Sequence, residues 1–243
     1  MMRGEVHLGF LGGSGIYGLD LGGEVEKVEV DTPFGKPSGP LQLMTLGEVR
    51  VAFLSRHGAG HKIPAHKLMH HANIRAMKDL GVERIVSTSS VGSLKMEIEP
   101  GSFLVPDDFF SPWKVVTFFD DEVKHITPTL DEVLRQGLIG TARNMGLHVH
   151  DRGTYVQAMG PRLETKAEIR AMSRFGDVVG MTMASEATLA NELGMRYASL
   201  CMVDNYCHGL VEEPLTYEKI LENQKNSSES AKALIMRFLG ELK

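Results

Sequence analysis

Short apolar runs alternate along the chain with segments in which apolar residues recur every three or four positions. Runs of four to eight apolar residues are typical of buried strands, and the wider spacing is typical of helices with one buried face. In the segment from His66 to Leu80, for example, Met69, Ala72 and Ala76 repeat at helical spacing, and Gly81 follows as a C-cap. This alternation predicts an α/β fold with a mixed or mostly parallel sheet.

The same pattern gives a set of expected elements. We expect strands at His7–Leu11, Leu41–Thr45, Val49–Leu54, Arg84–Ser87, Ser102–Val105, Gly153–Gln157, Val178–Met181 and Tyr197–Val203. We expect helices at His66–Leu80, Leu130–Met145, Lys166–Arg174, Ser185–Leu193 and Tyr217–Leu239. No linker or internal repeat divides the chain, so residues 1–243 are expected to form one domain, with Phe109–Thr127 as a long excursion.

Composition and charge narrow the class of protein. The chain has 243 residues, of which 42% are hydrophobic and 23% charged, and a net charge of -5, all ordinary for a soluble globular protein. No basic stripe favours a nucleic-acid partner, and no apolar run is long enough to span a membrane. With two cysteines, Cys201 and Cys207, and no secretory leader, we expect a reduced chain in the cytoplasm.

A glycine cluster, Gly12-Gly13-Ser14-Gly15, follows the first expected strand. Residues 13–18 also fit the G-x-G-x-x-G pattern of dinucleotide-binding proteins. That fingerprint requires a crossover helix after it, and the run Val25 to Val30 follows too soon to leave room for one. Two interpretations stay open: a turn of backbone N–H groups with the Ser14 hydroxyl that holds a small oxyanion, or a tight turn that needs glycines at positive φ.

Arg56 and His57 follow the strand that ends near Leu54 and are flanked by glycines. Arginine binds phosphate oxygens with a planar fork, and the histidine can donate a further hydrogen bond. A solvated surface loop is the alternative, but a strand end beside glycines favours a ligand. His61, His66, His70 and His71 lack the spacing of a zinc site, so we expect no metal.

Small hydroxylated residues come next, in a serine-rich turn after the strand at Arg84–Ser87. Ser89 and Ser90 are expected there, where the strand ends of α/β sheets present donors to ligands. Further on, Thr182 ends an apolar strand, and Asp204 ends another. A carboxylate at the end of a buried strand needs a partner or a function, and a turn-capping Asp is the simpler alternative.

Five motifs occur together in order. They are Gly12-Gly13-Ser14-Gly15, Arg56-His57-Gly58 with His61, Ser90-Val91-Gly92-Ser93-Leu94, Gly160-Pro161-Arg162-Leu163-Glu164-Thr165 and Val179-Gly180-Met181-Thr182. Over nearly the whole chain, this set resembles the trimeric purine nucleoside phosphorylase and methylthioadenosine phosphorylase family. The resemblance implies a single α/β domain with a twisted mixed central sheet flanked by helices, assembled as a homotrimer or homohexamer.

The resemblance also implies roles for particular residues. The phosphate site would consist of Ser14, Arg56, His57, Ser89, Ser90 and Thr182; the ribose site of Met181 and His61; and the base site of Leu163, Glu164 and Asp204. Arg56, His57 and Asp204 would be catalytic, with Asp204 as a general acid at N7 of the purine. Inorganic phosphate would be a co-substrate, with no cofactor and no metal, and a neighbouring subunit would help to close the site through Phe109–Thr127.

The identity of the purine depends on two of these positions. Relatives that prefer 6-oxopurines tend to carry Glu where this chain has Glu164 and Asn where it has Asp204. Because a carboxylate offers no N–H to a 6-oxo group, Asp204 favours a 6-aminopurine nucleoside such as methylthioadenosine or adenosine, with 6-oxopurine nucleosides or methylthioinosine as the alternative. A hydrolytic nucleosidase, a non-catalytic nucleotide or oxyanion sensor and an NAD oxidoreductase are rival classes, in that order.

Overall fold

The computed structural model describes residues 6, 8–14, 16, 24–46, 49–113 and 115–242. The part of the glycine cluster that includes Gly15 and residues 17–18 lies outside these ranges. Its strands are β1 Leu8–Gly12, β2 Glu26–Val28, β3 Leu41–Leu46, β4 Val49–Ser55, β5 Arg84–Ser93, β6 Phe103–Leu104, β7 Asp108–Phe110, β8 Val149–His150, β9 Thr154–Gln157, β10 Val178–Gly180 and β11 Arg196–Tyr206. The α-helices are α1 His70–Asp79, α2 Glu132–Asn144, α3 Lys166–Met172, α4 Met183–Glu192 and α5 Tyr217–Glu241.

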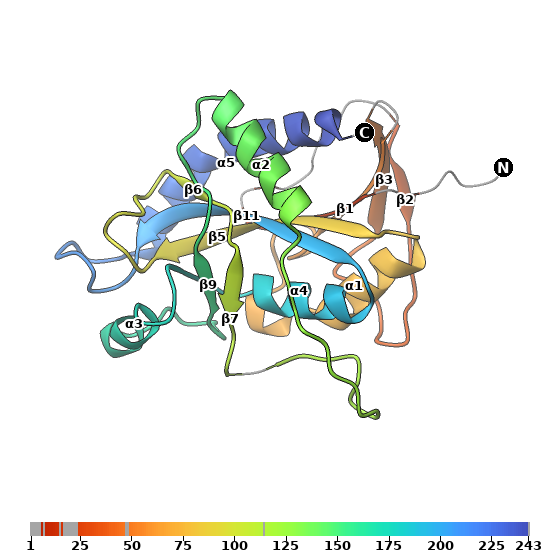
Figure 1. Cartoon of the computed structure of the whole chain (residues 1–243), viewed down its shortest axis with the longest axis horizontal. Helices are drawn as coiled ribbons and strands as arrows, with labels where there is room; N and C mark the ends of the chain where they lie inside the picture. The colour runs from red at the N-terminus through yellow and green to blue at the C-terminus, as the bar shows by residue number, and fades with distance from the viewer. Residues whose placement is uncertain are drawn as a thin grey trace.

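All of these strands belong to one mixed sheet. Its main path runs β2-β3-β4-β1-β5-β10-β9-β7, and β11 lies against β5 and leads to β6 and β8. β1 is parallel to β4 and β5, whereas β10 is antiparallel to β5. The expected α/β fold with a twisted mixed sheet is confirmed (Figure 1).

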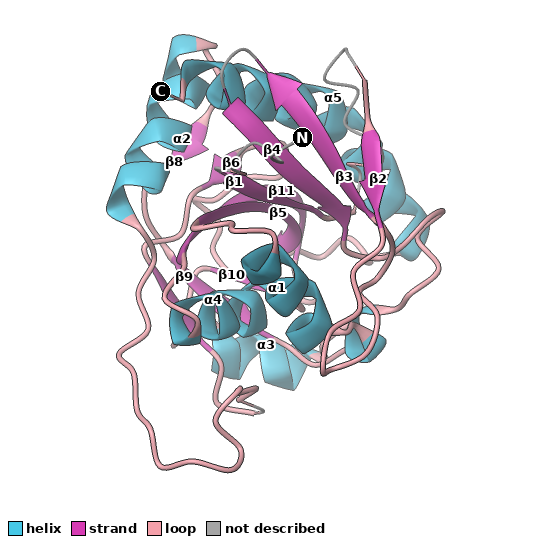
Figure 2. Ribbon diagram, turned by 90° about the vertical axis from the view of Figure 1, so that its right-hand side faces the viewer, coloured by secondary structure: helices cyan, strands magenta, loops and turns pink. Residues whose placement is uncertain are grey.

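Helices cover both faces of the sheet. Helices α2 and α5 lie on one side, and α1 and α4 lie on the other (Figure 2). Because helices cover both faces, the central strands are buried on both sides, and alternate residues of a strand pack against opposite helix layers. In β11, Leu200 and Met202 pack with α2 and α5, while Cys201 and Val203 pack with α1 and α4.

Most expected elements are present, with shifted ends. The main correction concerns β5, which continues through Ser93 where we expected a turn after Ser87. The strand is extended because β11 pairs with it over its whole length, so the serine-rich segment has a ladder partner. Three short strands were not expected, namely β2, β7 and β8, since two- or three-residue strands leave little periodic signal.

The excursion after β7 is anchored to the helices beneath it. Thr117 donates a hydrogen bond from its hydroxyl to Glu192 of α4 over 2.7 Å, and His71 of α1 donates to the Thr117 carbonyl over 2.8 Å. Between β7 and α2 the described residues form no helix or strand. No helix in the described part of the chain is long and apolar enough to cross a membrane.

Candidate active site

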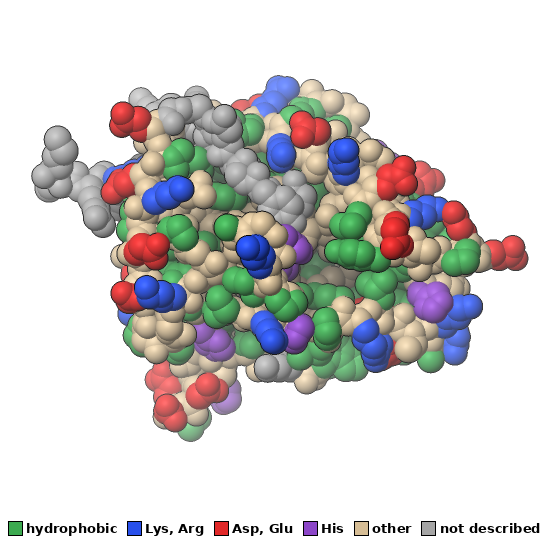
Figure 3. Space-filling view, turned by 180° about the vertical axis from the view of Figure 1, so that it is seen from behind, with side chains coloured by type: hydrophobic (Ala, Val, Ile, Leu, Met, Phe, Trp, Pro, Cys, Tyr) green, Lys and Arg blue, Asp and Glu red, His purple; other side chains and the backbone are tan. Residues whose placement is uncertain are grey.

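A cavity of about 790 Å³ opens where the sheet divides. β5 pairs with β1 as far as Ser87 and with β10 only from Gly92, so Thr88 to Val91 have no ladder partner on that edge. Side chains from both faces of β5 therefore reach the opening. The face in Figure 3 is hollowed near its centre, with hydrophobic and histidine side chains around the hollow. The cavity is lined by Ser14, Arg56, His57, His61, Ser89, Ser90, Leu163, Glu164, Met181, Thr182, Asn205, Cys207, Tyr217, Ile220, Leu221 and Gln224, among others.

Arg56 lies directly after β4 and is only 1% exposed. Its guanidinium donates two parallel hydrogen bonds to the Glu186 carboxylate, from Nε and, over 2.8 Å, from Nη2, and Nη1 donates to the Thr88 carbonyl over 2.9 Å. Burial disfavours the charge, but the Glu186 carboxylate more than compensates and holds the pKa of Arg56 above its usual value. Arginine has five N–H donors, so two remain for a ligand. Arg56 is thus a fixed positive charge at the cavity wall.

The glycines before Ser14 allow a close approach of backbones. A Cβ on Gly13 would lie 2.6 Å from Nη1 of Arg56, and one on Gly12 would lie 2.7 Å from the Phe53 ring. Neither glycine is among the residues with positive φ, so the tight-turn interpretation does not account for them. The Gly13 N–H donates to the Thr88 hydroxyl over 3.0 Å, which brings Ser14 to the cavity.

His57 is neutral in this environment. Burial, followed by the charge of Arg56, lowers the pKa of His57 to about 4. Its Nδ1 lies 2.8 Å from the Ile63 carbonyl, and because a carbonyl only accepts, Nδ1 carries the proton. Nε2 is therefore an acceptor, which corrects the expectation that His57 donates a hydrogen bond to the anion. The ring of His61, whose φ is 55°, lies 4.2 Å from the His57 ring between centroids.

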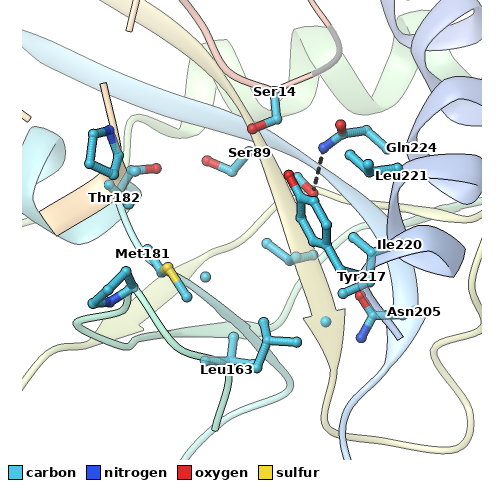
Figure 4. Close-up of a pocket in the computed structure, with 18 of the residues that line it drawn as sticks. Ser14, Ser89, Leu163, Met181, Thr182, Asn205, Tyr217, Ile220, Leu221 and Gln224 are labelled. Atoms are coloured by element: carbon cyan, nitrogen blue, oxygen red, sulfur yellow. Dashed lines mark hydrogen bonds between the residues drawn. The ribbon is translucent and has the colours of Figure 1, made fainter. Parts of the chain in front are cut away.

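Three hydroxyl groups are available beside Arg56. The buried Ser89 hydroxyl has no hydrogen-bond partner among the described residues. Thr182 is the N-cap of α4, yet its side chain makes no capping hydrogen bond. Figure 4 shows Ser14, Ser89 and Thr182 along one side of the cavity, with Met181 and Leu163 beyond them. The Arg56 charge and these hydroxyl donors suit an oxyanion such as phosphate.

Ser90 differs from Ser89 because its hydroxyl is already committed. It donates a short hydrogen bond to the Asp204 carboxylate and accepts one from Nε2 of Gln224 over 3.2 Å. Only its backbone N–H can serve an anion. The Thr88 carbonyl points to the open edge of β5. Residues two apart on a strand face the same edge, so the Ser90 N–H points there too.

Asp204 lies beneath the cavity and not on its wall. It is 1% exposed, and its carboxylate also accepts from the Ser227 hydroxyl over 3.1 Å. The pairing of β11 with β5 shifts register between Val203 and Asn205, and this bulge places Asn205 on the cavity wall in place of Asp204. The expectation that Asp204 reaches the base edge is therefore wrong.

The far end of the cavity is lined by a loop and by α5. Glu164 reaches the cavity from a loop that is fixed by the capping box of Thr165 and Glu168 and by the ion pair of Arg162 with Glu168, whose N and O atoms lie 2.8 Å apart. Burial, and secondarily Glu168, raises the pKa of Glu164. Leu163 is 42% exposed beside it.

The sequence missed Asn205 and the cavity-lining residues of α5. Asn205 stands next to the residue that was chosen, and a one-residue bulge cannot be seen in a sequence pattern. Tyr217, Ile220, Leu221 and Gln224 have helical spacing, which identifies a face of α5 but not what that face covers. The whole cavity thus has one end with a buried guanidinium and free hydroxyl groups, a middle lined by Met181, and a far end with a carboxyl and a carboxamide group.

The chain is similar in sequence and in fold to several known proteins. The 6-oxopurine nucleoside phosphorylase of Pyrococcus furiosus is 43% identical over 242 residues, covering 94% of this chain and 90% of that protein. The S-methyl-5'-thioadenosine phosphorylase of Pyrococcus horikoshii is 40% identical over 241 residues, covering 97% and 92%. Among solved structures, the methylthioadenosine phosphorylase of Schistosoma mansoni in complex with adenine superposes with a TM-score of 0.87 at 31% identity, covering 96% of this chain and 91% of that one.

The family model of the phosphorylase superfamily matches residues 7–240, which is nearly the whole chain. The resemblance seen in the five sequence motifs is therefore confirmed, and the chain belongs to the phosphorylase superfamily.

Proposed function

We propose that the protein is a purine nucleoside phosphorylase that cleaves a nucleoside with inorganic phosphate, giving free purine and pentose 1-phosphate. The observation that carries this proposal is the convergence of Ser14, Arg56, His57, Ser89 and Thr182 at one end of a cavity whose other end holds Glu164 and Asn205. A single cavity of about 790 Å³ has room for both substrates. Its relatives act on two kinds of purine nucleoside, according to their names.

The anion-binding end performs the group transfer. As the bond between C1′ and the base nitrogen breaks, its electron pair leaves with the purine and the sugar becomes oxocarbenium-like. Phosphate, held by Arg56, the free hydroxyls and the Ser90 N–H, stabilises that charge and forms the new C1′–O bond. Nε2 of His57 accepts a hydrogen bond from the protonated oxygen of hydrogen phosphate. The phosphate releases this proton once the C1′–O bond has formed, and the purine anion takes up one proton at a ring nitrogen, so no proton is gained or lost overall.

The far end of the cavity favours a 6-oxopurine. An ionised Glu164 accepts from the N1–H of a 6-oxopurine, whereas N1 of a 6-aminopurine carries a lone pair that the carboxylate would repel. The Asn205 carboxamide donates one N–H to the Tyr206 carbonyl over 2.9 Å, which leaves a donor and an acceptor for O6 or N7. The sequence favoured a 6-aminopurine only because Asp204 was expected here, so the preference reverses.

The remaining assignments belong to the same proposal. Met181 and His61 contact the ribose, and Leu163 covers the purine. A homotrimer or homohexamer is supported by exposed apolar side chains on the excursion, where Val115 is 70% and Val123 is 96% exposed. A cytoplasmic location is supported by the two free, buried cysteines.

The test is a substrate panel with and without phosphate. Inosine, guanosine, adenosine, methylthioadenosine and methylthioinosine are each incubated with the protein, and the released base is quantified. We expect release only with phosphate, and faster release from the 6-oxopurines. Undiminished release in phosphate-free buffer would instead identify a hydrolytic nucleosidase. Binding of the nucleosides without any cleavage would favour a non-catalytic sensor.

A further inference from the structure

Three side chains, those of Asp204, Ser90 and Gln224, form a hydrogen-bond chain that connects the floor of the cavity to its wall. The Asp204 carboxylate accepts from the Ser90 hydroxyl, and the Ser90 oxygen accepts from Nε2 of Gln224 over 3.2 Å. Gln224 lies on α5 and lines the cavity, whereas Asp204 is 1% exposed. Neither contact has a role in the phosphate transfer described above. The hydrogen-bond chain therefore needs another function.

The chemistry of the three groups determines which one donates and which one accepts at each step of the hydrogen-bond chain. An ionised carboxylate only accepts, and a hydroxyl has one hydrogen, so Ser90 gives that hydrogen to Asp204. The Ser90 oxygen can then only accept from Gln224. Gln224 must present its NH2 group to Ser90, which directs its carbonyl oxygen elsewhere. Figure 4 shows the dashed bond at the Gln224 nitrogen, with the oxygen on the other branch of the amide.

The Gln224 carbonyl oxygen is available to a ligand. No described residue donates a hydrogen bond to it. Gln224 is half-buried, and a carboxamide held in one orientation discriminates between ligands with and without a hydroxyl, because an unpaired polar group is costly.

We propose that Asp204 is a positioning residue that, through Ser90, holds the Gln224 carbonyl toward the cavity, where it accepts a hydrogen bond from one hydroxyl of the pentose. Gln224 is then a specificity-determining residue. The inference rests on the proposed function, because the pentose supplies the hydroxyl groups of a nucleoside. It assigns to Asp204 a role that does not require contact with the base.

The donor and acceptor roles in the hydrogen-bond chain depend on the charge of Asp204. A protonated Asp204 can donate to Ser90, and Ser90 can then donate to the Gln224 carbonyl, which reverses the chain. The groups that face Asp204 are Ser90 from β5 and Asn223, Gln224 and Ser227 from α5, all neutral, with Asn223 donating to the Asp204 backbone carbonyl over 2.7 Å. Burial raises the pKa of Asp204 to about 6, only partly offset by these hydrogen bonds. The reversal is expected below that pH.

The experiment compares inosine with 2′-, 3′- and 5′-deoxyinosine, each with phosphate at pH 8. We expect kcat/KM of one deoxy analogue to fall by roughly 3- to 10-fold more than kcat/KM of the other two, relative to inosine. That is the range for the loss of one neutral hydrogen bond. Gln224→Met, which keeps the length of the side chain but not its hydrogen bonds, should remove that factor for that analogue alone. Equal losses on all three analogues, in wild type and variant alike, would overturn the inference.

Asp204→Asn tests the positioning role. An asparagine can donate or accept, so the orientation of the Gln224 carboxamide is no longer fixed. The ratio of kcat/KM for inosine over the deoxy analogue should therefore fall by roughly 3-fold, a fraction of one hydrogen bond. The matched control is Asn223→Ala, which removes the hydrogen bond to the Asp204 backbone carbonyl but none of the side-chain hydrogen bonds among Asp204, Ser90 and Gln224. It should leave the ratio of kcat/KM for inosine over the deoxy analogue unchanged. If Asp204→Asn keeps the wild-type ratio, Asp204 has only a structural role.

The wild-type protein gives an independent reading. The ratio of kcat/KM for inosine over the deoxy analogue should fall in the wild type from pH 8 to pH 5.5. It should not vary with pH in Asp204→Asn. A constant ratio in the wild type over this interval would contradict the inference even if the variant fails to fold. A protein that cleaves no nucleoside with phosphate would instead refute the proposed function, so the two failures are distinguishable.

Discussion

Ser89 and Ser90 are neighbours on β5, yet their side chains face opposite sides of the cavity and their hydroxyl groups are in different states. Ser89 faces the α4 side, where its hydroxyl has no described partner and is free for an anion. Ser90 faces α5, where its hydroxyl is bound by Asp204 and Gln224. The α4 side, the proposed anion site, is built on strand ends and a buried ion pair. The α5 side is a hydrogen-bonded wall whose direction is set by one buried carboxylate. Identical residues acquire different functions from the face of the strand on which they lie.

Removing the buried charge of the anion site should have the largest effect. Arg56→Met leaves Glu186 buried without its cation, which should lower the free energy of unfolding by about 3–5 kcal/mol. Arg56→Lys keeps a charge but not the fork, and its kcat/KM should fall by roughly 100-fold or more, mostly through the KM for phosphate. Thermal unfolding and phosphate titrations measure the two effects. A lysine variant with wild-type phosphate KM would show that Arg56 only supports the fold.

The buried carboxylate of the α5 side should appear in the pH dependence of stability. The pKa of Asp204 is raised from 3.8 to about 6, so the folded protein holds this proton more tightly than the unfolded chain. The contribution of this proton to the free energy of unfolding is fully present below pH 4 and is lost as the pH rises through about 6. The loss is up to about 3 kcal/mol in all. Denaturant unfolding should show this loss in the wild type, and Asp204→Asn should lack it. Identical curves for both proteins would argue against a perturbed Asp204.

The two serines can be compared directly. Ser89→Ala should raise the KM for phosphate by roughly 10-fold or more, because it removes a donor to a charged ligand. Ser90→Ala keeps the backbone N–H, so its phosphate KM should change by about 3-fold at most. Steady-state kinetics at saturating nucleoside measure both. Equal effects would mean that the Ser90 hydroxyl also binds the anion.

The base end should respond in specificity more than in rate. Asn205→Asp removes the donor for O6, and the ratio of kcat/KM for inosine over adenosine should fall by roughly 10-fold. Because burial raises the pKa of Glu164, the same ratio in the wild type should rise with pH as that carboxyl ionises. Glu164→Gln should abolish this rise. A ratio insensitive to both residues would remove them from the base site.

More of the residues predicted for the anion site than of those predicted for the base site line the cavity. Arg56, His57 and Ser89 are recognisable because each follows or lies within a strongly apolar strand, and strand ends converge at one edge of a sheet. The extension of β5 through Ser93 could not be foreseen, because it depends on pairing with β11, far along the chain. The exchange of Asp204 for Asn205 depends on a bulge of one residue, which only the register of two paired strands reveals.

The fate of the phosphate oxygens is the sharpest test of the account. Inosine should be incubated with the protein and 18O-labelled phosphate, and the sugar product analysed by mass spectrometry. We expect ribose 1-phosphate carrying all of the labelled oxygens, formed in equal amount to the free base. Free ribose that carries an oxygen from water would show that no phosphate is held beneath the sugar, and the proposed chemistry would have to be abandoned.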